Sequence, residues 1–241
     1  VIAISKEIII LSRKIASLDV CSTLAFIAKT HNWCRPFIDN SKDFIIKDGR
    51  HSVVEKTIFK KSLNAFVPND CSLSTNEHLW LITGPNMAGK STFLRQNAHI
   101  IILAQIGSYV PAKQAKIGIA NKLFSRIGAS DNISKGQSTF MVEMLETSNI
   151  IKNADDKSFI ILDEIGRGTS TFDGLAIAWA IIEKVLRSNK SRTLFATHYH
   201  ELTEIEKTNS KVRNVSCEIK EWNDEIIYSY KIIEGKSKGS L

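Results

Sequence analysis

The first thirty residues carry apolar side chains at helical spacing. Steps of four and three residues separate Ile4, Ile8, Leu11, Ile15 and Leu18. This heptad spacing places apolar residues along one face of a helix. A second helix is expected over residues 20–29, before Pro36 ends the helical region. Two interpretations of the apolar face stay open: it packs on the chain's own domain, or it is the end of a long helix that arrives from an upstream domain.

From Phe37 onward the pattern changes to short β-type runs that alternate with helical stretches. Strands are expected at residues 44–46, 57–59, 79–83, 159–162, 193–196 and 226–230, and helices at 91–106, 139–153, 174–187 and 200–208. The run at 159–162 is apolar throughout, as a central strand covered on both faces requires. This alternation predicts an α/β fold with a mixed, mostly parallel sheet that is flanked by helices.

The composition is that of a folded domain. Of the 241 residues, 43% are hydrophobic and 24% are charged, which excludes a disordered or a fibrous chain. The net charge of +7 permits an anionic partner such as a nucleotide or a nucleic acid, although solvated basic residues on the surface explain it at least as well. No run approaches the roughly 20 apolar residues of a membrane span, so no membrane partner is predicted.

The cysteines give no sign of a metal site. Cys21, Cys34, Cys71 and Cys217 are far apart in the sequence, and none of them forms a C-x-x-C pair. This spacing argues against a zinc site or a thioredoxin-like redox site. We therefore expect free, buried thiols in a protein of a reducing compartment.

The strand expected at residues 79–83 leads directly into a glycine-rich loop that reads G-x-x-x-x-G-K-S. Glycines let the backbone turn so that its N–H groups point at phosphate oxygens, and the N-terminus of the following helix favours the same anion. Lys90 is expected to reach the β- and γ-phosphates of a nucleotide, and Ser91 to bind Mg²⁺ through its hydroxyl. The predicted nucleotide-binding residues of this loop are Gly84, Pro85, Asn86, Met87, Ala88, Gly89, Lys90, Ser91 and Thr92.

Two carboxylates, Asp163 and Glu164, follow the apolar run at 159–162. The end of a buried strand is a costly place for charge unless another group compensates it. Mg²⁺ would compensate Asp163, and Glu164 would then polarise the water that attacks a γ-phosphate. A strand that simply ends in a polar turn is the local alternative. The position of the pair, 73 residues after Lys90 with strands between, favours a Walker B motif.

Two further segments carry candidate residues. Residues 136–144 read as a glycine loop that enters a helix, with Ser138 or Thr139 at the N-cap position. A serine at a helix N-terminus is also a good ligand of a γ-phosphate. His198 follows the strand expected at 193–196, so it would lie at the sheet edge where ligands bind in open α/β sheets. Helix capping and a structural histidine are the alternatives for these two positions.

Four segments in this order resemble the ATPase domain of the MutS family of bacterial DNA mismatch repair proteins. They are GPNMAGKST, GQSTFMVEM, LDEIGRGTSTFDG and TLFATHYHEL, which begin at residues 84, 136, 162 and 193. The resemblance also covers residues 49–55 and 66–70, and it extends from about Leu18 onward. It implies a P-loop NTPase of ABC type that uses ATP and Mg²⁺ and works as a dimer of two facing ATPase domains.

The resemblance also implies a role for each candidate residue. The glycine loop would hold the phosphates, with Ser91 and Asp163 at the Mg²⁺ site. Glu164 would be the general base, and His198 would sense or stabilise the γ-phosphate. The signature residues Ser138 and Thr139 would complete the site of the partner subunit. Phe66 and Asn69 would lie near the adenine, and Tyr230 is a weaker candidate for the same place.

The family pattern divides the chain into residues 1–43, the end of a helical lever domain, and residues 44–241, an ATPase domain that is truncated at its C-terminus. Domains that read the mismatch are expected upstream, and dimerisation elements are expected after residues 239–241. We therefore expect a fragment that binds nucleotide but does not recognise a mismatch alone. Its implied partners are a second copy, mismatched double-stranded DNA through absent domains, and a repair protein of the MutL type, in the bacterial cytoplasm near the nucleoid.

Two alternatives of function stay open. The first is an ABC ATPase of another kind, such as a transporter motor, although transporter signatures usually read like Leu-Ser-Gly-Gly-Gln and residues 133–140 read ISKGQSTF. The second is an isolated nucleotide-binding module that is inactive because its dimerisation elements are missing. Activity that rises with protein concentration would distinguish a composite two-subunit site from such a module.

Overall fold

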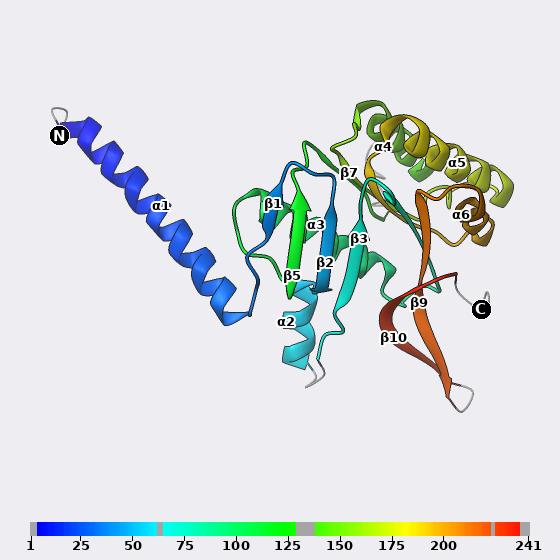
Figure 1. The fold of residues 1–241 in the computed structure, drawn as a ribbon, viewed down its shortest axis with the longest axis horizontal. Coiled ribbons are helices and arrows are strands. Elements are labelled where there is room, and N and C mark those ends of the chain that lie inside the picture. Colours follow the sequence, from blue (N-terminus) through cyan, green and yellow to red (C-terminus); the bar gives the residue numbers. More distant parts are fainter. Residues whose placement is uncertain (1–3, 62–64, 129–137, 223–224, 237–241) are drawn as a thin grey trace.

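The computed structural model describes four ranges of the chain, residues 4–61, 65–128, 138–222 and 225–236. Within them, a helix at the N-terminus extends from an α/β body (Figure 1). Two of the features that the sequence singles out lie outside the described residues, namely the signature stretch before Ser138, with Gly136 and Gln137, and the C-terminal residues 237–241.

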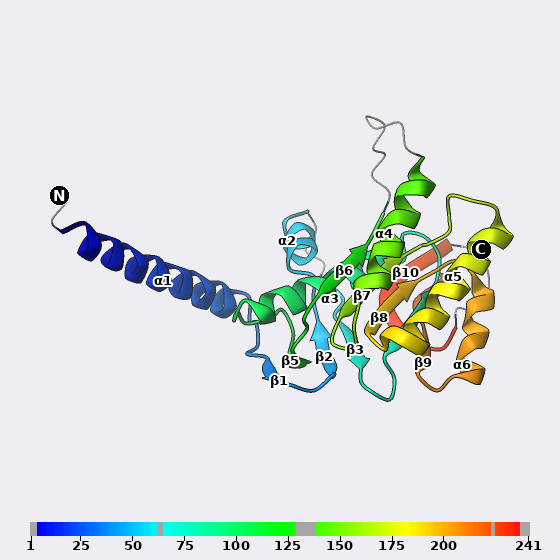
Figure 2. The same ribbon diagram turned by 90° about the horizontal axis from the view of Figure 1, so that it is seen from above.

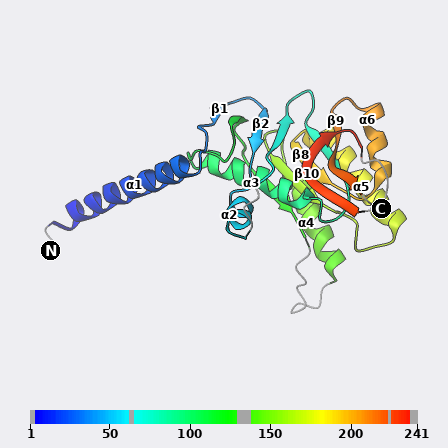
Figure 3. The ribbon, with the colours of Figure 1, turned by 90° about the horizontal axis from the view of Figure 1, so that it is seen from below.

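The N-terminal segment is one continuous helix, α1 (Ser5–Thr30). The expected division into two helices is wrong, because no glycine or proline interrupts the chain between Ile4 and Pro36. The apolar stripe of α1 is exposed, with Leu18 71% accessible, and Ala28 is the single buried residue of this helix, all of which is described. The helix extends away from the body in every view (Figure 1, Figure 2 and Figure 3). The stripe therefore does not pack on the chain's own domain.

The described strands form two sheets. The smaller sheet has the order β1 (Phe37–Asp39), β5 (Gln114–Gly118), β2 (Phe44–Gly49) and β3 (Asn69–Leu73). The larger sheet has the order β10 (Glu225–Glu234), β9 (Val212–Trp222), β4 (Leu79–Thr83), β8 (Arg192–Ala196), β7 (Phe159–Asp163) and β6 (Leu123–Arg126). In the larger sheet β10 is antiparallel to β9, and the other neighbours are parallel. The predicted α/β class with a mixed, mostly parallel sheet is confirmed.

The helices of the body begin and end close to their predicted positions, except α2, which was not predicted. They are α2 (Ser52–Lys61), α3 (Lys90–Gln105), α4 (Thr139–Asn153), α5 (Thr171–Lys184), which continues as the π-helix Val185–Asn189, and the 3₁₀ helix His200–Glu204, which continues as α6 (Ile205–Thr208). The strand expected at residues 57–59 is wrong, because these residues belong to α2. His51 caps that helix by accepting the Val54 N–H at 3.4 Å, and the exposed Phe59 has no neighbouring strand to pair with.

The central strands are buried on both faces, as the unbroken apolar runs predict. In β4, Trp80 and Ile82 pack against α3 and the smaller sheet, whereas Leu79 and Leu81 pack against α5 and the segments that follow β8. The strand β7 alternates in the same way. Such strands leave room for charge only at their ends.

Hydrogen bonding sets the strand ends of the larger sheet at one level. Ala196 of β8 pairs with Ile82 of β4 on one side and with Asp163 of β7 on the other. The three strands are parallel, so the loops that follow them leave the sheet at the same edge. The glycine loop, Glu164 and His198 all lie on these loops, and this is why residues far apart in the sequence meet.

The burial of the four cysteines can be compared with the expectation of free, buried thiols. Cys71 and Cys217 are buried free thiols, as expected, and Cys34 is partly buried. The expected burial is wrong for Cys21, which is exposed because it lies on α1, away from the body.

Among the described residues, no helix has both the length and the apolar character needed to cross a bilayer.

The two sheets are joined by the buried side chain of Arg192, which is 1% exposed. Its guanidinium donates hydrogen bonds to the carbonyl oxygens of Gly118 at 2.7 Å, Lys157 at 2.9 Å and Ile119 at 3.2 Å. It also lies 6.0 Å from the ring centroid of Phe159. Gly118 belongs to the smaller sheet and Arg192 to the larger one, so these bonds fix the sheets against each other.

We predict that Arg192→Met lowers the free energy of unfolding by at least about 3 kcal/mol. Methionine fills a similar volume but donates nothing, and each buried carbonyl left without a donor costs about 1–3 kcal/mol. Urea unfolding followed by circular dichroism measures the change. The exposed neighbour Lys190 provides the control, because Lys190→Met should change stability by less than about 0.5 kcal/mol. Equal stability of the two variants would contradict the bridging role of Arg192.

Candidate functional site

The glycine loop joins β4 to α3 through a backbone that few residue types adopt. Gly84 and Gly89 have φ angles of +132° and +103°, in the region that favours glycine. Gly89 is the N-cap residue of α3 and provides no side-chain acceptor. The first N–H groups of α3 therefore remain available to an anion that lies in front of the helix.

Lys90 lies inside the loop and is only 4% exposed. Its ammonium donates to the carbonyl oxygens of Gly84 at 2.5 Å and of Pro85 at 3.1 Å, and it lies 3.6 Å from Oε1 of Glu164. The loop from Pro85 to Thr92 and Glu164 together line a cavity of about 150 Å³. The predicted lysine and the predicted base thus face the same small space.

Ser91 and Asp163 contact each other at the sheet edge where β4, β8 and β7 end. The Ser91 hydroxyl donates to Oδ2 of Asp163 at 2.6 Å. The other carboxylate oxygen, Oδ1, is buried and has no hydrogen-bond donor in the described part of the chain. Burial raises the pKa of Asp163, against the hydrogen bond from Ser91, and the charge of Glu164 raises it further. An anionic oxygen held in this way fits a hard divalent cation.

The oxygen atoms of Ser91 and Asp163 are of the kind that a hard divalent cation such as Mg²⁺ prefers. No group of three or more His, Cys, Asp or Glu side chains that could hold a metal ion occurs among the residues described. Mg²⁺ characteristically uses one or two protein oxygen ligands and completes its shell with water and substrate phosphates. The Ser91 hydroxyl and the Asp163 carboxylate could provide such a pair of oxygen ligands.

Glu164 is held in an unusual conformation. Its φ angle is +53°, and a non-glycine residue in such a region costs of order 1–3 kcal/mol unless its surroundings fix it. Its N–H donates to the Ala196 carbonyl at 3.0 Å, and Arg167 donates to its Oε2 at 2.7 Å. The sequence did not single out Arg167, because only the turn of the loop brings its side chain back to the carboxylate.

His198 faces the same carboxylate from the loop after β8. Its ring packs against Tyr199, with the ring centroids 4.1 Å apart. Loss of hydration lowers the pKa of His198 below its usual 6.5, the negative charge of Glu164 acts in the opposite direction, and Arg167 adds to the lowering. The lowered pKa favours the neutral imidazole, in which one nitrogen donates and one accepts.

A larger cavity of about 680 Å³ lies beside the glycine loop. Phe66 and Asn69 line it, as expected for residues near a base, and so does Tyr230. The amide of Asn69 donates to the Tyr230 carbonyl at 2.9 Å and accepts the Ile232 N–H at 2.8 Å, which fixes the bulge of β10. Apart from Thr92 and Tyr230, sequence reasoning missed the lining residues that come from α2, α3 and β10, which are Val54, Ile58, Phe93, Gln96, Tyr228 and Ser229.

The two signature residues lie at the start of α4. Ser138 is the N-cap, and its hydroxyl accepts the Met141 N–H at 3.1 Å. Ser138 and Thr139 are both exposed, and Thr139 also lines a cavity of about 440 Å³ together with Ser91, Asp163 and Glu164. The described residues thus bring the loop, the acidic pair and His198 together, and they leave the capping hydroxyl of Ser138 on the surface.

Comparison with known proteins identifies the family. The family model named MutS domain V matches residues 80–241. The chain belongs to the MutS family. It is 52% identical over 233 residues to the DNA mismatch repair protein MutS of Ruegeria pomeroyi. The aligned residues are 96% of this chain and 27% of that protein.

Two other relatives give the same picture. The DNA mismatch repair protein MutS of Orientia tsutsugamushi is 54% identical over 223 residues, which are 92% of this chain and 25% of the relative. The protein of the same name from Ehrlichia chaffeensis is 50% identical over 240 residues, 100% of this chain and 29% of the relative. This MutS-family chain thus spans about a quarter of the length of the relatives that it matches.

We predict that Glu164→Gln lowers the pKa of His198 further, because it removes the negative charge that favours the imidazolium. An NMR titration of the histidine ring signals measures this pKa, with His198→Gln to assign the signal. His78 is an internal control, since its pKa is lowered by burial and its charged neighbours are Lys211, Lys42 and Lys190. A His198 titration that Glu164→Gln leaves unchanged would contradict the facing arrangement.

Proposed function

We propose that this MutS-family chain is the ATP-binding and ATP-hydrolysing domain, of P-loop and ABC type, of a DNA mismatch repair protein. The observation that carries the proposal is the convergence of Lys90, Ser91, Asp163 and Glu164 at one sheet edge, beside a cavity large enough for a nucleoside. The names of the relatives support the repair role.

Each residue has a distinct part in the proposed reaction. The N–H groups of the glycine loop and the Lys90 ammonium hold the β- and γ-phosphates. Ser91 and Asp163 hold Mg²⁺, which supplies charge that stabilises the transferring phosphoryl group. Glu164 accepts a proton from the attacking water, and neutral His198 donates a hydrogen bond to the γ-phosphate. Phe66 and Tyr230 enclose the adenine ring of the nucleotide.

The electrostatics of the edge support this division of roles. Lys90 lies between two loop carbonyls and Glu164, so a phosphate that enters finds a cation already positioned and already dehydrated. Positioning and charge stabilisation provide most of the acceleration in phosphoryl transfer. A base held at a fixed backbone conformation, as Glu164 is, needs little reorganisation when water attacks.

Two substitutions separate binding from turnover. Lys90→Ala should weaken ATP binding by about ten- to a hundredfold, since a charge-assisted hydrogen bond contributes roughly 1.5–3 kcal/mol. Glu164→Ala should keep ATP binding and slow hydrolysis by about 10²- to 10⁴-fold, the usual contribution of a general base. Equilibrium binding of ATP with Mg²⁺ and release of phosphate measure the two effects, with Glu201→Ala as the control carboxylate. Hydrolysis by Glu164→Ala at the normal rate would show that Glu164 is not the base.

The complete site is proposed to form between two chains. In this arrangement Ser138 and Thr139 reach the nucleotide of a second copy, which agrees with the exposed N-terminus of α4. Contact with mismatched DNA and with a MutL-type protein in the bacterial cytoplasm is proposed for the whole protein. The isolated nucleotide-binding module is the second candidate, because the exposed position of Ser138 leaves the site of a single chain without it.

The two candidates differ in how activity depends on concentration. A site shared between two chains predicts that the ATPase rate per molecule rises with protein concentration, because association completes the site. Phosphate release measured over a dilution series tests this, with Glu164→Ala at each concentration as the background. A rate per molecule that stays at the background, while ATP still binds, would favour the isolated module.

A further inference from the structure

The backbone of Gly166, two residues after Glu164, is held by side chains from other elements at its N–H and at its carbonyl, which belong to neighbouring peptide groups. Its N–H donates to Oε1 of Glu143 at 2.6 Å, and its carbonyl accepts from the Tyr199 hydroxyl at 3.0 Å. Gly166 has a φ angle of +89°, and a Cβ there would lie 2.7 Å from the Gly174 carbonyl oxygen. The loop is thus clamped at a residue that allows no side chain.

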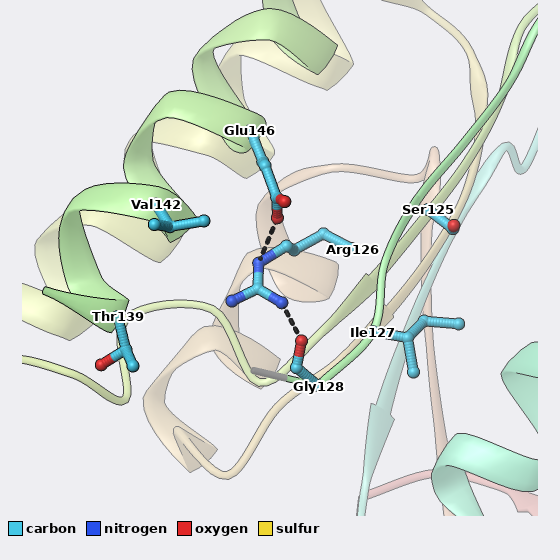
Figure 4. A pocket seen from close by; sticks show the side chains of 7 residues that line it. All are labelled: Ser125, Arg126, Ile127, Gly128, Thr139, Val142 and Glu146. Carbon is cyan, nitrogen blue, oxygen red and sulfur yellow. Dashed lines mark hydrogen bonds and ion pairs between the residues drawn. The ribbon is translucent and has the colours of Figure 1, made fainter. Parts of the chain in front are cut away.

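Glu143 is a buried charge on α4, only 7% exposed. Its second carboxylate oxygen, Oε2, lies 3.7 Å from Nη2 of Arg126. Arg126 is also buried, its Nε lies 3.0 Å from Oε2 of Glu146, and it donates to the carbonyl of Gly128 (Figure 4). A buried ion pair is not a cheap source of stability, since desolvation offsets most of the attraction between the charges. A role in holding Gly166 accounts for its presence here.

The clamp borders the proposed reaction site without entering it. Glu143 and Arg126 line the same polar cavity as Ser91, Asp163 and Glu164. Tyr199 is the residue after His198, and its ring lies against the His198 ring. Ile165, between Glu164 and Gly166, is buried in the core, so the backbone between the base and the clamp has little freedom.

We propose that Glu143 and Tyr199 are positioning residues that fix the orientation of Glu164 by holding the Gly166 backbone, and that Arg126 holds Glu143 in place. The inference rests on the proposed role of Glu164 as the base. Glu143 and Ser138 belong to the same end of α4, so the helix that presents Ser138 also holds the base of its own chain. A displacement of α4 therefore reaches Glu164 through one hydrogen bond.

Three variants test the clamp. Glu143→Gln has one acceptor oxygen in place of two, and it removes the negative charge that lies 3.7 Å from Nη2 of Arg126. Tyr199→Phe removes only the hydroxyl that binds the Gly166 carbonyl. Glu146→Gln is the matched control. It lies on the same helix as Glu143 and weakens the other ion pair of Arg126. Glu146 is not among the residues that bind Gly166 in the described part of the chain.

The expected result is a loss of turnover without a loss of binding. Glu143→Gln and Tyr199→Phe should slow single-turnover hydrolysis, with protein in excess over ATP, by about ten- to a hundredfold, while the Kd for ATP with Mg²⁺ changes less than about twofold. Hydrogen–deuterium exchange should become faster over residues 164–168 in both variants. Glu146→Gln should leave the rate, the Kd and the exchange unchanged. The effects of the two clamp variants should combine to less than their product, because both act on the backbone of one residue, Gly166.

Two outcomes overturn the clamp. One is unchanged exchange over residues 164–168 in both clamp variants, and the other is faster exchange with hydrolysis at the unmodified rate. Tyr199→Phe keeps the test decisive if Glu143→Gln does not fold. If the unmodified chain binds ATP with Mg²⁺ but hydrolyses none at any concentration, the proposed catalytic function of the isolated chain has failed, and the exchange measurement alone decides the clamp.

Discussion

The common register of β4, β8 and β7 is the constraint on which the candidate site depends. Ala196 pairs with Ile82 and with Asp163, so three parallel strands end at one level. Their apolar interiors exclude charge, and the polar residues gather on the loops where the strands end. Glu164 donates its N–H to the Ala196 carbonyl and Thr197 donates to the Ile82 carbonyl, which extends this register into the loops themselves. The site is thus a consequence of how the sheet is paired.

The same edge holds features that cost stability. Asp163 has a buried carboxylate oxygen without a donor in the described part of the chain, Glu164 has a left-handed backbone, and Lys90 is almost fully dehydrated. Partial compensation comes from within, since Lys90 lies near Glu164 and Ser91 donates to Asp163. Natural proteins keep such strained, incompletely satisfied groups mainly where function needs them. The bonds of Arg192 at the opposite end of β8 help the fold to tolerate that cost.

Sequence reasoning succeeded where a local pattern decides the outcome. The apolar runs predicted β4 and β7, and the glycine spacing placed Lys90 and Ser91 at the start of the helix after β4. It failed where tertiary contacts decide. The β-branched and aromatic residues at 57–59 suggested a strand, but they have no partner strand and join α2. The base-sized cavity draws on α2, α3 and β10, and its residues Ile58, Gln96 and Tyr228 share no motif. Arg167 and Arg192 act through contacts that no spacing in the sequence reveals.

The position of Glu143 links the two ends of the proposed chemistry. Ser138 caps α4 at an exposed helix end, and Glu143 binds the Gly166 peptide little more than one turn later on the same helix. A helix transmits an axial shift almost undiminished over so short a distance, because its backbone hydrogen bonds are continuous. If Ser138 of one copy contacts a nucleotide bound to a second copy, this contact would therefore act on Glu164 of the copy that provides Ser138. Tyr199 holds the carbonyl of the same residue beside His198, so in the proposed clamp the conformation of Glu164 depends on both α4 and the loop that carries His198.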